Sequence, residues 1–84
     1  MLVQYDPDVG ATYVVLSETP CARTVEVGDL VAVDVDEHGD PVGVDFAVAV
    51  HQITESMIAE VVSVFPELKP VIGDSREWMP QLSY

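Results

Sequence analysis

Apolar residues in the first half of the chain occur in five short runs separated by turn-forming residues. The runs span residues 2–5, 12–17, 22–27, 30–35 and 42–46, and their β-branched and aromatic residues favour strands. The breaks carry Asp, Pro and Gly, which form tight turns. Strands joined by loops this short are antiparallel neighbours, because a parallel connection needs about a dozen residues. The pattern predicts an antiparallel β-meander of about five strands.

Several of these strands carry apolar side chains on both faces. In the fourth run, for example, Val31, Val33 and Val35 oppose Leu30 and Ala32. An antiparallel sheet with one face in water normally alternates apolar and polar residues more cleanly. We therefore expect another element to cover the second face of the sheet.

The second half of the chain contains one helical pattern, over residues 53–65. Thr54 suits the N-cap position, and Ile53 and Ile58 have the spacing of a hydrophobic staple. A proline at position 66 ends the helix. The apolar side chains on one helical face are Met57, Ile58, Val61, Val64 and Phe65.

The segment after the helix is rich in residues that interrupt regular structure. Pro66, Pro70, Gly73 and Pro80 fall within residues 66–84, so we expect an irregular C-terminal tail. The predicted fold is a single α+β domain over residues 1–84, with a β-meander at 1–47, one helix at 53–65 and a tail at 66–84.

The charge balance is strongly acidic. Fifteen Asp and Glu face three Lys and Arg, giving a net charge of −12. Phosphate backbones and anionic membranes repel such a chain, so neither nucleic acid nor membrane is an expected partner. A basic protein would be attracted to it. A solvated acidic surface adapted to high salt is the alternative explanation. At 84 residues the core is small, which favours a homodimer.

One acidic loop has the spacing of a calcium-binding loop. Asp34, Asp36, His38 and Gly39 are followed by Asp45, as in the first half and last position of an EF-hand. The flanks are strand-like rather than helical, and histidine is a poor ligand for a hard cation. We therefore favour a hairpin turn. Asp34, Asp36 and Asp45 are the weak metal candidates, and no metal site is predicted.

Nothing in the chain has the pattern of a catalytic centre. Cys21, His38 and His51 share no motif, and zinc-type cysteine pairs and glycine-rich phosphate loops do not occur. We expect a small buried thiol at Cys21. The protein is predicted to be neither an enzyme nor dependent on a cofactor.

The end of the chain carries candidate binding residues. Trp, Tyr and Met are enriched in interface cores, which makes this segment a candidate anchor for a partner; alternatively it folds back over its own sheet. The amino terminus lacks a signal-peptide pattern and no apolar run is long enough to span a bilayer, so a cytoplasmic protein is expected. The candidate partner-binding residues are Trp78, Met79, Leu82 and Tyr84.

Two stretches of the sequence resemble a known family. Residues 5–17 (YDPDVGATYVVLS) have a Tyr-Asp-Pro-acidic turn before an aliphatic strand, and residues 34–46 (DVDEHGDPVGVDF) have a Gly turn before a Val-Gly-aliphatic strand. Over about residues 1–47 the chain is similar to a small prokaryotic family called domain of unknown function 2283. The resemblance implies a β-meander without assigned catalytic residues, and an antitoxin-like role.

These observations lead to one expected function and one alternative. We expect an acidic, non-enzymatic binding module, antitoxin-like, that masks a basic partner such as an RNase-like toxin. The alternative is a structural homo-oligomer without a different partner, whose apolar sheet faces pack together.

Overall fold

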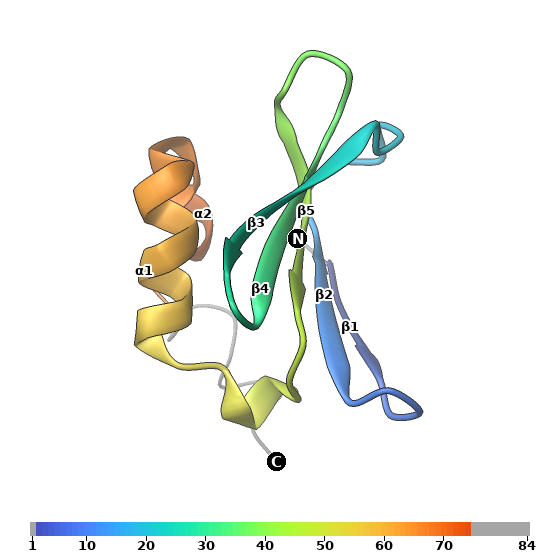
Figure 1. Ribbon diagram of the computed structural model, residues 1–84, viewed down its shortest axis with the longest axis vertical. Coiled ribbons are helices and arrows are strands. Elements are labelled where there is room, and N and C mark those ends of the chain that lie inside the picture. Colours follow the sequence, from blue (N-terminus) through green and yellow to red (C-terminus); the bar gives the residue numbers. More distant parts are fainter. Residues whose placement is uncertain (1, 75–84) are drawn as a thin grey trace.

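A computed structural model describes residues 2–74 of the chain (Figure 1). A five-stranded antiparallel sheet is followed by helices that cover one of its faces. The predicted α+β fold, with an antiparallel sheet before a helix, is confirmed. The strands are β1 (Leu2–Asp6), β2 (Ala11–Val15), β3 (Arg23–Gly28), β4 (Val31–Val35) and β5 (Pro41–Phe46). The helical elements are η1 (Val50–Gln52), α1 (Glu55–Val64), η2 (Pro66–Leu68) and α2 (Lys69–Ile72).

The strands lie in the order β1-β2-β5-β4-β3. Consecutive strands pair within the β1–β2 hairpin and within the β3–β4–β5 meander. The one departure from sequential order is that β2 pairs with β5 rather than with β3. The linker of residues 16–22 therefore runs from the β1–β2 hairpin to the far edge of the sheet. Strand β5 is the central strand of the sheet.

The core lies between the sheet and the helices. Val14, Val44 and Val33 face one another across β2, β5 and β4, and all three are fully buried. Ile58 and Val61 of α1 pack onto the same cluster, and α1 lies alongside β3 and β4 (Figure 1). The expected covering of one sheet face by the helix is confirmed, whereas in residues 2–74 no helix covers the other face.

Helix α1 begins where its capping residues predict. The Thr54 Oγ1 accepts a hydrogen bond from the Met57 N–H at 3.2 Å, which satisfies a donor that the first turn leaves free. Ile53 and Ile58 are both buried, as expected for a hydrophobic staple. Val64 is half exposed, contrary to its expected place on the packed face.

Residues 66–72 are more ordered than the sequence suggested. Leu68 and Ile72 are buried in the core, so this part of the predicted irregular tail is helical and packed. The physical reason is the position of the prolines. Pro66 and Pro70 lie in the first turns of η2 and α2, where a missing N–H costs no hydrogen bond. Within residues 2–74, no helix is both long and apolar enough to cross a membrane.

Candidate functional site: the open face of the sheet

The face of the sheet that lies opposite the helices, here called the open face, presents two rows of side chains. The strand register aligns one residue from each strand in each row. Because side chains alternate between faces along a strand, members of a row lie side by side. The first row is Gln4, Tyr13, Asp45, Ala32 and Glu26; the second is Leu2, Val15, Gly43, Asp34 and Thr24.

A hydrogen-bonded network joins three strands on this face. The Tyr13 hydroxyl donates to Asp34 Oδ2 at 2.8 Å, and the Thr24 hydroxyl donates to Asp34 Oδ1 at 2.6 Å. Each carboxylate oxygen of Asp34 therefore has a donor. Bonds to an ionised acceptor are stronger than neutral ones, so Asp34 is held in one orientation.

The Tyr13 ring reaches Asp34 by crossing the central strand at a glycine. Tyr13 lies on β2 and Asp34 on β4, with Gly43 of β5 between them. A Cβ atom at Gly43 would collide with the Tyr13 ring and hydroxyl. Gly43 thus leaves the space that the ring occupies, a close approach that only glycine permits.

Asp45 lacks the donors that Asp34 has. Asp45 is exposed at the surface, but partial desolvation of its carboxyl raises the pKa, and the nearby Asp34 carboxylate raises it further. Burial and the bond to Asp34 likewise raise the pKa of Tyr13 above its usual range. Within the described residues, no group donates a hydrogen bond to the Asp45 carboxylate. Its carboxylate is therefore available to accept a hydrogen bond from a group outside residues 2–74.

Two hollows flank Asp45 on the open face. The larger, of about 450 Å³, lies over β1, β2 and their connecting turn. The smaller, of about 150 Å³, lies over the β3–β4 turn. Both include Asp45 in their lining, with Asp6 in the first and Glu26 and Asp29 in the second. Each hollow combines carboxylates with apolar or backbone surface.

No Lys or Arg of residues 2–74 lies on the open face. Arg23 pairs with Val35, a core residue, so its side chain leaves the sheet on the helix side. Lys69 belongs to α2 and lines a groove between the helices. The carboxylates of the open face therefore lack an internal counter-charge in this part of the chain.

The three weak metal candidates are divided between two environments. Asp34 and Asp45 lie on the open face, whereas Asp36 lies in the β4–β5 turn. There its Oδ1 accepts from the His38 N–H at 2.9 Å and the Asp40 N–H at 3.0 Å. Among the residues described, no group of three or more His, Cys, Asp or Glu is placed to hold a metal ion.

The β4–β5 connection is the hairpin turn favoured from the sequence. Gly39 has φ +85°, a conformation that glycine adopts without strain. The Asp40 N–H and, to a smaller extent, the His38 N–H hold the pKa of Asp36 below its usual range, against the effect of burial. Asp36 is committed to this turn and is only 8% exposed.

Replacing Asp36 by asparagine should change how stability depends on pH. Asparagine can accept the same bonds but carries no charge. Because the folded pKa is lowered, the charge stabilises the wild type above the unfolded pKa of about 4, and this advantage disappears as the pH falls through the folded pKa. The test is to measure the urea midpoints of both proteins from neutral pH to strong acid. The difference between the two midpoints should disappear at low pH. A pH-independent gap between them would contradict this assignment.

The thiol and the imidazoles do not form a catalytic arrangement. Cys21 is exposed, so the expected buried thiol is wrong; it lies in the linker between β2 and β3, and its Sγ–H donates to the Arg23 carbonyl at 3.3 Å. His38 lines the same hollow of about 300 Å³ as Cys21, but its Nε2 lies 3.7 Å from the exposed Glu37 carboxylate. His51 is exposed in η1.

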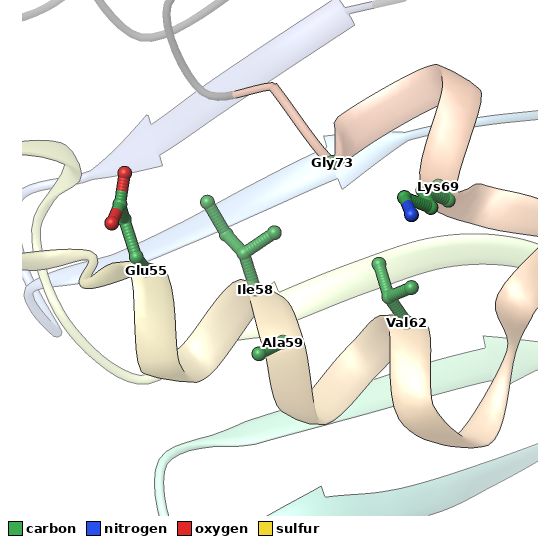
Figure 2. A pocket seen from close by; sticks show the side chains of 6 residues that line it. All are labelled: Glu55, Ile58, Ala59, Val62, Lys69 and Gly73. Carbon is green, nitrogen blue, oxygen red and sulfur yellow. The ribbon is translucent and has the colours of Figure 1, made fainter.

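Another concave surface lies between α1 and α2 (Figure 2). This groove has a volume of about 350 Å³, and Ile58 and Val62 point into it from α1. Glu55 and Lys69 supply one charge of each sign. The remaining candidate residues, Trp78, Met79, Leu82 and Tyr84, lie outside the described residues.

The fold and the open face define a class: a two-layer α+β domain with helices on one side of the sheet and an acidic face on the other. The family model described as "Protein of unknown function (DUF2283)" matches residues 2–48, more than half of the chain. The protein belongs to this family, as the sequence resemblance predicted. The match spans all five strands and ends before α1. No curated protein and no solved structure matches the sequence.

Proposed function

We propose that the domain is a non-enzymatic, cytoplasmic binding module that receives a basic protein on its open face. The observation that carries the proposal is the charge of that face. Within residues 2–74, this face presents the carboxylates of Glu26, Asp34 and Asp45. Arg23 and Lys69, the two basic residues of this part of the chain, lie elsewhere. A partner with Lys and Arg on its surface complements such a face.

The charge supports an antitoxin-like role. A toxin that acts on nucleic acid needs cationic side chains to hold phosphates, and an acidic sheet face competes for the same side chains. The long-range attraction would speed association, and added salt would slow it. Exposed ion pairs contribute only about 0–1 kcal/mol each, so the affinity must come largely from apolar contacts.

Two sources of apolar contact are available to the partner. The hollows of the open face include Val9, Ala11, Leu30 and Ala32 in their lining. The second source is the C-terminal set of Trp78, Met79, Leu82 and Tyr84, which remains part of the proposal as its aromatic anchor.

Capture from an extract of the source cells tests the proposal. The wild type should retain a basic protein, and the double variant Glu26→Gln/Asp45→Asn should lose it. The matched control, Glu18→Gln/Glu67→Gln, removes two exposed charges elsewhere and should retain the partner. The captured protein, identified and purified, should rebind the wild type at least about tenfold more tightly than the face variant, with weaker binding at higher salt. Equal binding by both double variants would refute a role for the open face.

A second candidate function is the homo-oligomer, and the free edge of β1 favours it. Among residues 2–74, β1 pairs with β2 alone. Its side chains Leu2 and Tyr5 are 56% and 50% exposed. An unpaired edge strand is a template for another strand, and two copies of β1 would extend the sheet across a two-fold axis. Light scattering on the purified domain tests this candidate. The wild type and Glu26→Gln/Asp45→Asn should both have the mass of a dimer.

A further inference from the structure

The larger hollow of the open face has a lining that suits one kind of side chain. It is bounded by β1, β2, Asp45 of β5 and the turn between the first two strands. Its volume is about 450 Å³, compared with about 350, 150 and 300 Å³ for the three other hollows described above. Its lining residues are Gln4, Tyr5, Asp6, Pro7, Val9, Ala11, Tyr13 and Asp45.

One aromatic ring of this lining, that of Tyr13, is held in place. The Tyr13 hydroxyl is held by Asp34 at 2.8 Å, and the ring fills the space above Gly43. Because its hydroxyl is bonded to Asp34 and its ring packs on Gly43, Tyr13 presents a fixed ring surface to a group that enters the hollow. A flat cation stacks well on such a ring.

Carboxylates and apolar groups occupy the rest of the lining. Asp45 receives no hydrogen bond from the described residues. Asp6 also lines the hollow, and its Oδ1 accepts a hydrogen bond from the Asp8 N–H at 3.0 Å. Val9 and Ala11 line the same hollow and would contact the aliphatic part of a long side chain. Such a combination accommodates a side chain that has an apolar stem and a cationic end.

We propose that this hollow receives an arginine side chain of the partner, with its guanidinium between the Tyr13 ring and the Asp45 carboxylate. The inference rests on the proposed function and specifies the chemistry of the contact. Arginine suits the site better than lysine, because its planar group both stacks on an aromatic ring and donates two parallel hydrogen bonds to a carboxylate. Asp45 then gains the donors that residues 2–74 do not supply.

The test is a titration with N-acetyl-arginine amide, followed through backbone amide signals in NMR. Saturable shifts should appear at Gln4, Ala11, Tyr13 and Asp45 and be absent from α1. The citrulline analogue has nearly the same shape without the charge, and should cause no saturable shifts. The lysine analogue should bind more weakly than arginine. Asp45→Asn should weaken arginine binding by about fivefold or more.

Glu67→Gln is the matched control, because it removes one exposed charge outside the open face. It should bind the probe as the wild type does, and the amide spectrum of each variant reports whether it is folded. Equal shifts with citrulline, or shifts spread over all acidic loops, would overturn the inference.

The inference and the proposed function can fail separately. If Asp45→Asn alone keeps both the probe and the partner while Glu26→Gln/Asp45→Asn loses the partner, the hollow is not the arginine site and the open face still binds. If no basic partner is captured by the wild type, the proposed function fails, whatever the probe does.

Discussion

Replacing Ile72 by alanine is expected to cost about 2–5 kcal/mol of the free energy of unfolding, the range for removing a large buried aliphatic side chain. Ile72 is fully buried in the cluster formed by the sheet and α1. A domain of this size is stable by only about 5–15 kcal/mol. The variant should therefore show a much lower urea midpoint, because one residue of a four-residue helix contributes a large part of the core's stability.

Val71→Ala provides the matched comparison. Val71 belongs to the same short helix but is 41% exposed, so its truncation should cost less than about 1 kcal/mol. Urea unfolding of both variants, monitored by circular dichroism, measures the difference. Equal losses at positions 71 and 72 would mean that α2 does not pack as described.

Replacing Gly43 by alanine is expected to displace the Tyr13 ring from the open face. The added methyl group would occupy the position of the ring and its hydroxyl. The free energy of unfolding of the variant should be lower by about 1–3 kcal/mol, the usual cost of adding an atom to a packed site. It should also lose the bond between Tyr13 and Asp34. The Tyr13 titration, followed by ultraviolet absorbance, should move back toward its ordinary pKa.

A second substitution isolates the clash. When Tyr13 is first replaced by serine, Gly43→Ala no longer meets a ring, so its cost should be smaller than in the wild type. The coupling between the two positions should be at least about 1 kcal/mol, well above the scatter for independent sites. Tyr13→Phe removes the hydroxyl alone and measures the contribution of the hydrogen bond. Additive effects at positions 13 and 43 would rule out the contact.

Features that depend on neighbours in the sequence could be predicted from the sequence. The Asp36–Gly39 turn and the Thr54 cap are made by side chains and backbone groups at most four residues apart. Their residue types alone determine the geometry. The valine-rich runs likewise identified the strands, because alternation and β-branching act within each strand.

Features that depend on pairing between distant segments were not predictable in the same way. A loop of seven residues between β2 and β3, residues 16–22, is compatible with a hairpin, but β2 pairs with β5. Short antiparallel strands have similar local preferences, so the choice of partner depends on how the whole set of apolar faces packs. Helix α2 does not stand out in the sequence, because its proline resembles an interruption although first-turn positions accept proline.

The sequence predicts only some of the residues that form the open face. The sequence singles out Asp34 and Asp45 only through their spacing in a loop, and no pattern in it points to Tyr13. Two features of the sequence point to this face. Gly43 interrupts an apolar strand, and Asp34 and Asp45 alternate with apolar residues along their strands, which places them on the face opposite the core. A glycine within a strand often marks a close approach by another group, but only the register shows that the group is Tyr13.

The order of strands in the sheet has a consequence for synthesis on the ribosome. The central strand, β5, is the last of the five to leave the exit tunnel. Until then the nascent chain can form only two separate hairpins, β1–β2 and β3–β4, and isolated two-stranded hairpins are marginally stable in water. The arrival of residues 41–46 supplies a partner to both hairpins at once. Translational pauses after residue 46 has emerged would therefore favour assembly of the complete sheet, whereas earlier pauses would prolong the exposure of two unpaired edges.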